Sequence, residues 1–171
     1  MDDEESMREL LAIVFDNEGY ETEAVADVPQ ARDTLETGAF DVVITDLRIG
    51  SDRNAGMELL AWLRDNAPGI PAIMITAHGS VETAIEAMKL GAADYVLKPF
   101  KNDELKLVVQ RAIEQRDLMR ENVALRKELA RRGELEMIVG KSRAIEDVRS
   151  MIRRVAQLPS TVAIHGESGT G

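Results

Sequence analysis

Cysteine is absent from the 171 residues, so the chain has no disulfide framework, no thiolate chemistry and no cysteine zinc site. Long apolar runs are also absent, because no stretch approaches the roughly 18 residues that span a bilayer. The acidic start MDDEE is the opposite of the basic start of a secretory signal. We therefore expect a soluble, cytoplasmic protein with no membrane partner. Its hydrophobic content of 44% is sufficient for an ordinary packed core.

Basic residues are scarce in the first hundred positions, where 20 Asp and Glu stand against 7 Lys and Arg. Residues 101–171 hold 11 acidic and 14 basic residues, so net charges of −13 and +3 combine to −10. A surface as acidic as the first part repels a nucleic-acid backbone, and the weakly basic remainder is not a DNA-binding patch. We expect no direct DNA binding by this chain.

Helical patterns alternate with short buried strands over the first hundred residues. Helical spacing of apolar residues predicts helices at 6–17, 27–38, 57–64 and 80–90. Continuous apolar runs predict buried strands at 41–46, 71–76 and 94–97, with a further extended candidate at 20–26. Strands that alternate with helices imply right-handed crossovers, so the predicted fold class is α/β, a doubly wound parallel sheet covered on both faces.

A long helix is predicted at 102–132, where the sequence contains neither proline nor glycine. Its second half places Leu118, Asn122, Leu125 and Leu129 at steps of four, three and four, which is a heptad seam with Leu at d and Asn122 at a. We expect residues 103–132 to form a homodimer through this seam, and a solvated single helix is the alternative. A helix at about 143–155, a strand at 161–165 and a glycine-rich end follow.

Chemistry-bearing side chains fall at the carboxyl ends of the predicted strands, which is where sites lie in such sheets. These ends carry Asp46, Thr76 and Lys98, and the topology places Asp2 and Asp3 beside Asp46. Three converging carboxylates require a cation, and oxygen ligands suit Mg²⁺. An aspartate beside Mg²⁺ is a competent nucleophile toward phosphorus and forms an acyl phosphate. Lys98 can pair with the phosphoryl oxygens, and Thr76 can hydrogen-bond one of them.

Three segments resemble bacterial two-component response-regulator receivers: DDEESMRELL at 2–11, VVITDLR at 42–48 and IMITAHGSVETAIEAMKLGAADYVLKPF at 73–100. The resemblance implies a flavodoxin-like receiver domain over residues 1–117 that accepts a phosphoryl group from a sensor histidine kinase. It implies that Asp46 is the phosphoacceptor. The Mg²⁺ ligands that it implies are Asp2, Asp3, Asp46 and the main-chain carbonyl of Arg48.

The same resemblance implies a switch pair, Thr76 and Tyr95, and a Lys98 that binds the phosphoryl group before a cis Pro99. Each residue has a simpler explanation when taken alone. An Asp at a strand end is more often a cap than a nucleophile, and Tyr95 alone would be a half-buried strand aromatic. The matching positions together favour the receiver.

Two departures from the receiver pattern stand out. The loop at 48–56 is longer by about two residues than the usual turn, and only Met1 precedes the acidic pair where receivers have a hydrophobic strand. We therefore expect a receiver whose first strand is missing, with weak support for Asp2 and Asp3. The alternative function is a non-phosphorylatable interaction and dimerisation fragment.

The segment MIVGKSRAIEDVRSMIRRVAQLPSTVAIHGESGTG at 137–171 resembles the entry to the AAA+ domain of sigma-54-dependent transcription activators of the nitrogen-regulator type. We therefore expect a helical linker at 118–134 and a truncated AAA+ piece at 135–171. The parent protein would bind DNA and sigma-54 RNA polymerase. The first six positions of a P-loop, whose amides cradle phosphates, are Gly166, Glu167, Ser168, Gly169, Thr170 and Gly171. The motif needs a Lys and a Ser or Thr next, so we expect an inactive ATP site and no enzyme.

Overall fold

The computed structural model describes residues 1–77, 79–136, 140, 142–156, 161 and 163, and for 129–136 and 153 it describes the main chain alone. The chain divides into two compact units, Met1–Glu121 and Asn122–Gly171. Among the described residues, no helix is long and apolar enough to cross a membrane.

A parallel sheet of three strands forms the centre of the first unit, in the order β1 (Val43–Asp46), β2 (Ala72–Thr76) and β3 (Asp94–Leu97). The order matches the chain order, and the carboxyl ends of all three strands lie at one edge of the sheet. The register aligns Asp46 with Ile75 and Thr76 with Leu97. The three strands predicted from apolar runs are therefore confirmed.

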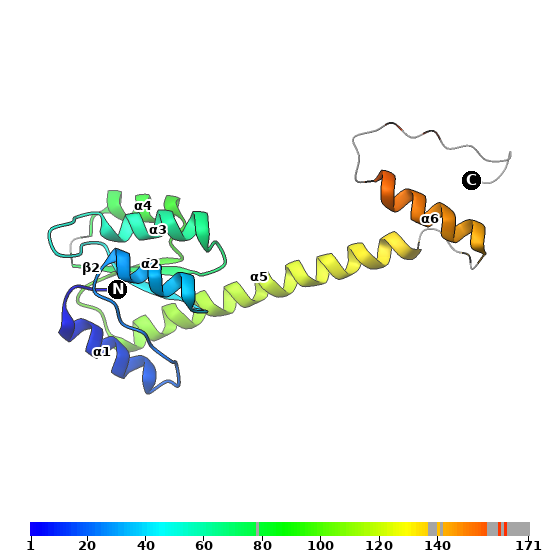
Figure 1. Cartoon of the computed structure of the whole chain (residues 1–171). Helices are drawn as coiled ribbons and strands as arrows, with labels where there is room; N and C mark the ends of the chain where they lie inside the picture. The colour runs from blue at the N-terminus through cyan, green and yellow to red at the C-terminus, as the bar shows by residue number, and fades with distance from the viewer. Residues whose placement is uncertain (78, 137–139, 141, 157–160, 162, 164–171) are drawn as a thin grey trace. The chain divides into compact units, whose positions relative to one another are not determined.

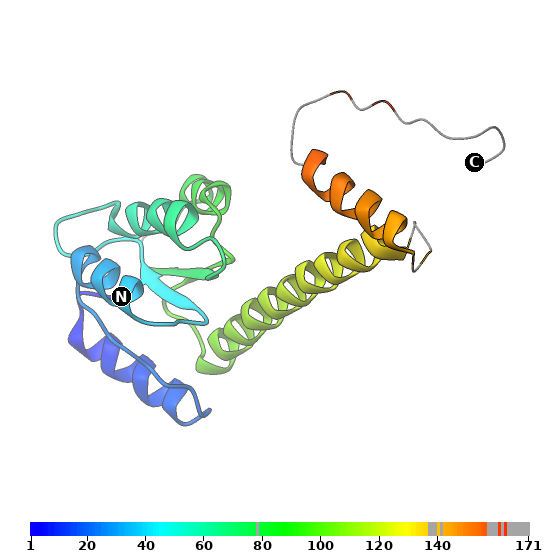
Figure 2. The same cartoon turned by 45° about the vertical axis from the view of Figure 1, so that its right-hand side comes forward.

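Helices cover both faces of this sheet, as Figures 1 and 2 show. One apolar core joins β2 to α2 (Val28–Thr37), α3 (Ala55–Asn66) and α4 (Val81–Leu90). The other core joins the sheet to α1 (Glu5–Asp16) and to the first part of α5 (Asn102–Glu136). Met74 faces the first core and Ile73 and Ile75 face the second, because successive side chains of a strand point to opposite faces. The predicted doubly wound architecture is confirmed.

The helix boundaries follow from local chemistry. Asp27 caps α2, accepting a hydrogen bond from the Gln30 amide at 2.9 Å, and such a cap contributes about 1 kcal/mol. A capping box begins α4, and Gly91 ends it with a φ of 101° in the left-handed region that glycine favours. The helices predicted around these signals are confirmed, with ends that differ by a few residues.

The strand expected at 20–26 is wrong, because no strand is assigned there. An extended segment becomes a strand only when another main chain pairs with it. Here the partner is Asp2, whose amide donates to the Val25 carbonyl at 3.3 Å. On the other side, the Met1 amine donates to Ile44 at 2.7 Å and the Met1 carbonyl accepts from the Asp46 amide at 3.0 Å. Met1 and Asp2 thus make a short parallel ladder between residues 20–26 and β1.

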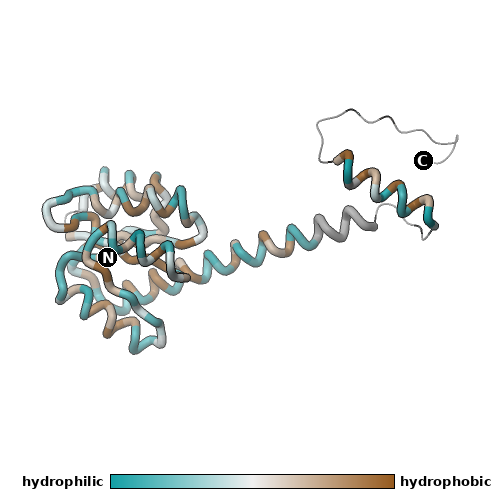
Figure 3. The backbone as a smooth tube through the Cα atoms, viewed as in Figure 1, coloured by the Kyte–Doolittle hydropathy of each residue, from teal (hydrophilic) through white to brown (hydrophobic). Residues whose placement is uncertain are grey.

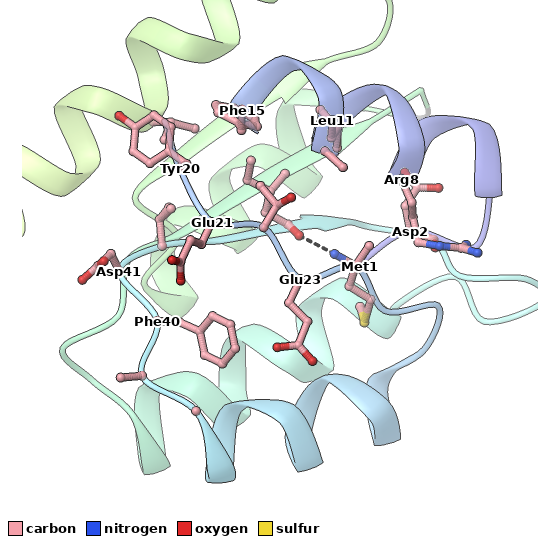
Figure 4. Close-up of a pocket in the computed structure, with 18 of the residues that line it drawn as sticks. Met1, Asp2, Arg8, Leu11, Phe15, Tyr20, Glu21, Glu23, Phe40 and Asp41 are labelled. Carbon is pink, nitrogen blue, oxygen red and sulfur yellow. Dashed lines mark hydrogen bonds between the residues drawn. The ribbon is translucent and has the colours of Figure 1, made fainter. Parts of the chain in front are cut away.

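A cavity of about 720 Å³ adjoins this ladder, and Figure 4 shows Met1 within its lining. Residues 20–24 line one side and residues 38–42 and Ile44 the other, while Leu11, Phe15 and Val109 contribute apolar surface. The cavity is thus bordered by residues 20–24 and by Ile44 of β1.

The second unit is described over the end of α5 and over α6 (Arg143–Val155), whose N-cap Ser142 accepts from the Ile145 amide. Both helices were predicted and are confirmed. Hydrophilic and hydrophobic stretches alternate along α6 in Figure 3. The strand expected at 161–165 and the glycine-rich end at 166–171 lie outside the described residues, apart from 161 and 163.

Candidate functional site

Asp46 ends β1 and is 8% exposed. Its Oδ1 accepts from the Arg48 amide at 3.1 Å, and its Oδ2 accepts from Lys98 Nζ at 2.7 Å. Gly56 keeps this strand end close to α3, since a Cβ there would collide with the Asp46 carbonyl, and its amide donates to Leu47 at 3.0 Å. The strand end is therefore held by the main chain on several sides.

Lys98 bridges two carboxylates that are 52 and 96 residues away in the sequence. Besides Asp46, its Nζ donates to Asp2 Oδ2 at 2.8 Å, and Asp2 is 1% exposed. The Asp2 Oδ1 accepts from the Glu4 amide at 3.0 Å, which fixes the carboxylate just before α1. The Lys98 amide donates to the Thr76 carbonyl at 2.8 Å, so the end of β2 places the lysine. The Lys98–Pro99 peptide bond is cis, as expected.

The charges of this site shift the pKa of two amines. Burial lowers the pKa of Lys98, but hydrogen bonds and charges from Asp2 and Asp46 outweigh burial and raise it above its usual value. Burial lowers the pKa of the Met1 amine to about 6, although Asp2 and Asp46 oppose that change. Lys98 is therefore the persistent cation between the two buried carboxylates.

Asp3 lies apart from the buried pair. It is exposed, and its Oδ2 accepts from the Gly50 amide at 3.0 Å in the long loop at 48–56. Gly50 has a φ of 57°, and Ile49 and Asp52 close the tip of that loop by exchanging main-chain hydrogen bonds. The structure thus brings Asp2, Asp46 and Lys98 together and directs Asp3 to the loop. Among the described residues, no three His, Cys, Asp or Glu side chains form a group placed to hold a metal ion.

The two expected switch residues lie on neighbouring strands. Thr76 is fully buried at the end of β2, and Tyr95 is half-buried on β3, opposite Met74. The Tyr95 hydroxyl lies 3.1 Å from the Thr83 hydroxyl in α4. We did not single out Thr83 from the sequence, although its spacing from Ser80 is that of a helix-capping pair.

The remaining expected sites lie in the second unit or at its border. Leu118 is 65% exposed and Leu125 is 51% exposed on α5, and Asn122 is exposed as well. The side chain of Leu129 lies outside the described part of the chain. So do the six P-loop residues, Gly166, Glu167, Ser168, Gly169, Thr170 and Gly171.

A parallel sheet covered on both faces, with an aspartate, a threonine and a lysine at successive strand ends and a second buried aspartate beside them, defines a receiver-type signalling domain. The Response regulator receiver domain family matches residues 1–110, and the chain belongs to this family. It carries the receiver domain of a two-component response regulator of the NtrC type. Receiver domains generally are non-enzymatic phosphoacceptors that bind Mg²⁺ at the phosphorylation site, and receivers of this type partner with histidine kinases and can dimerise.

Several named proteins are similar over the whole chain. The alginate biosynthesis transcriptional regulatory protein AlgB of Pseudomonas aeruginosa is 35% identical over 171 residues, which is 100% of this chain and 37% of AlgB. The nitrogen assimilation regulatory protein NtrX of Azorhizobium caulinodans is 33% identical over the same residues and 37% of its own length. This chain thus spans little more than a third of these relatives.

Solved structures agree with these relatives. The structure of NtrX from Brucella abortus in complex with ADP is 39% identical, with a TM-score of 0.68, and the match covers 91% of this chain and 34% of that one. The receiver domain of the same NtrX is 38% identical with a TM-score of 0.62, and the match covers 66% of this chain and 94% of that domain.

Proposed function

We propose that this chain is a phosphoacceptor receiver, in which a sensor histidine kinase transfers a phosphoryl group to Asp46 to control a sigma-54-dependent transcription activator. The observation that carries the proposal is the contact of Lys98 Nζ with both buried carboxylates, at 2.7 Å from Asp46 and 2.8 Å from Asp2. A strand-end aspartate held by a cation beside a second acid is the arrangement that acyl-phosphate formation needs.

In the proposed transfer, a carboxylate oxygen of Asp46 attacks phosphorus, an oxygen–phosphorus bond forms, and the bond from phosphorus to the donor nitrogen breaks. The ammonium of Lys98 would then contact the phosphoryl oxygens, because it pairs with them as it pairs with carboxylates. Thr76 lies at the neighbouring strand end, where its hydroxyl would approach a phosphoryl oxygen. Thr76 and Tyr95 are the proposed switch pair.

The residues at this site fit Mg²⁺, because two buried carboxylates already converge on one cationic atom and carboxylate oxygens suit a hard cation. Asp2, Asp3, Asp46 and the main-chain carbonyl of Arg48 are the proposed ligands. When bound, Mg²⁺ supplies positive charge that offsets the charge on the phosphoryl oxygens. The Oδ2 atom of Asp3 accepts from the Gly50 amide, so Asp3 would use its other oxygen or leave that amide to bind the ion.

The test is the intact mass of the chain after incubation with a small phosphodonor and Mg²⁺. We expect one added phosphoryl mass, no addition to Asp46→Asn, and normal addition to Asp33→Asn, which changes an exposed aspartate on α2. Equal labelling of the Asp46→Asn chain contradicts the assignment.

The second candidate function is a non-phosphorylatable interaction and dimerisation fragment. It is favoured by the exposed Leu118 and Leu125 and by the short Met1–Asp2 ladder that supports the acidic site. An unlabelled chain that still forms a homodimer through residues 103–132 would support this function over the first.

The wider organisation is also a proposal. We assign residues 1–117 to the receiver, 118–134 to a helical dimerisation linker and 135–171 to the start of a sigma-54-interacting AAA+ domain of a cytoplasmic regulator. DNA and sigma-54 RNA polymerase would be partners of the parent protein and not of these residues.

A further inference from the structure

The Tyr95 hydroxyl forms a hydrogen bond with the first turn of α4. Thr83 Oγ1 lies 3.0 Å from the Ser80 carbonyl, 2.9 Å from the Ser80 amide and 3.1 Å from the Tyr95 hydroxyl. A threonine hydroxyl has one hydrogen and two lone pairs. The Ser80 carbonyl can only accept and the Ser80 amide can only donate, while either hydroxyl can be the donor in the hydrogen bond between Thr83 and Tyr95.

Gly79 provides the space for this contact. A Cβ on Gly79 would collide with the side chain of Leu97 and would lie 2.9 Å from the Tyr95 hydroxyl oxygen. Real Cβ atoms do not approach other atoms this closely, so a larger residue would displace the tyrosine. The start of α4 therefore combines a hydroxyl partner for Tyr95 at Thr83 with open space at Gly79, and both residues belong to the segment that follows Thr76 along the chain.

We propose that Thr83 is a positioning residue whose hydroxyl holds the Tyr95 side chain against the first turn of α4. This hydrogen bond determines the fraction of unphosphorylated molecules in which the Tyr95 side chain lies against α4. The regulatory consequence rests on the proposed function: phosphorylation of Asp46 must break the bond before Tyr95 can follow Thr76. A neutral hydrogen bond of this kind changes the balance between the two side-chain positions by about two- to tenfold.

The test uses the full chain with 3-fluorotyrosine, because the sequence contains two tyrosines and ¹⁹F NMR then gives two assignable signals. Tyr20→Phe identifies the Tyr95 signal. Thr83→Val removes the hydroxyl and keeps the shape of the side chain, while Thr83→Ser keeps the hydroxyl. Ser80→Ala is the matched control. It removes the Ser80 hydroxyl, which accepts from the Thr83 amide and lies 3.4 Å from the Thr83 hydroxyl, but it leaves the Thr83 hydroxyl and its contact with Tyr95 in place.

Without phosphodonor, we expect Thr83→Val to move or broaden the Tyr95 signal, and we expect Thr83→Ser and Ser80→Ala to leave it near its original position. An unchanged Tyr95 signal in Thr83→Val overturns the proposal. A shift of equal size in Ser80→Ala or in Thr83→Ser also overturns it, because helix capping or side-chain size would then be the cause. Circular dichroism verifies that each variant is folded, and Thr83→Ala replaces any valine variant that is not.

A second arm adds a small phosphodonor and Mg²⁺ and records intact mass beside the spectrum. We expect Thr83→Val to take up the same phosphoryl mass as the parent chain and to reach its shifted Tyr95 signal at a lower fraction of labelling. If no chain gains mass, the proposed function fails, while the first arm still decides the role of Thr83. Equal labelling with an identical Tyr95 response in both chains contradicts the regulatory consequence.

Discussion

Lys98 donates to Asp46 at 2.7 Å with both side chains 11% exposed, so this ion pair is shielded from solvent on both sides. Lys98 also forms an ion pair with Asp2, at 2.8 Å. Removing one partner of a buried ion pair leaves a charge without compensation, and this loss is larger than the net stabilisation by the intact pair. The acidic site therefore contributes to the folding of the domain as well as to its proposed chemistry.

We predict that Lys98→Met lowers the free energy of unfolding by about 3–5 kcal/mol in the absence of divalent cations. The reason is that Asp2 and Asp46 would remain buried beside each other with no ammonium between them. Lys106→Met is the control, because its pair with Glu18 is far more exposed and such surface pairs contribute little to stability. Urea denaturation followed by circular dichroism measures both. Equal losses in the two variants would show that the buried bridge has no special role.

Stability should rise with pH between about 6 and 8 because of the Met1 amine. Its pKa falls from 8.0 to about 6 on folding, so the unfolded chain binds more protons in this window. Unfolding then becomes less favourable as pH increases, by up to roughly 2–3 kcal/mol for a two-unit shift. Denaturation at pH 6, 7 and 8 measures the slope. The same chain with an acetylated amino group is the control, and a slope that survives acetylation belongs to other groups.

The exposed leucines of α5 give a prediction about self-association. We expect Leu118→Ala with Leu125→Ala to shift the chain from dimer to monomer in sedimentation equilibrium, because both occupy the d positions of the seam. Val123→Ala is the matched control, since Val123 is 52% exposed on the same helix but lies off the seam. A parent chain that is already monomeric would make this part of α5 a solvated helix face.

An apolar extension in front of Met1 should stabilise the first unit. Met1 is already in ladder register with β1, and the adjoining cavity of about 720 Å³ is lined by Leu11, Phe15 and Ile44. Four to five buried apolar side chains at roughly 1.5–3 kcal/mol each amount to about 6–15 kcal/mol, an upper bound on the gain. Thermal unfolding of chains that carry five added valine and isoleucine residues, or five glycine and serine residues as control, measures the difference. Identical melting temperatures for the two extensions would contradict the prediction.

The strands and most helix boundaries could be predicted because their signals are local. The apolar run before Asp46 is buried on both faces wherever it lies, and Asp27 and Gly91 cap helices through their nearest neighbours. The segment at 20–26 could not be predicted in this way, because an extended segment forms a strand only if another segment of main chain pairs with it, and its own residues do not determine that. Sequence alone could not supply that information.

The candidate site divides in the same way. The positions of Asp46, Thr76 and Lys98 at strand ends followed from topology, and the structure places them at one edge of the sheet. The direction of Asp3 could not be predicted, because it depends on where the loop brings the Gly50 amide. The contact between Tyr95 and Thr83 joins residues 12 apart through the tertiary fold, and no periodic pattern in the sequence predicts it.

The ammonium of Lys98 already occupies the space between the carboxylates of Asp2 and Asp46. A second cation at this site competes with the Lys98 ammonium. Because Lys98 is part of the chain, its local concentration does not fall on dilution. Under the proposed function, Mg²⁺ would have to displace the Lys98 ammonium from Asp2 and Asp46 in order to bind there. The Mg²⁺ concentration at which the site fills would then depend on how firmly the Lys98 side chain holds these two carboxylates.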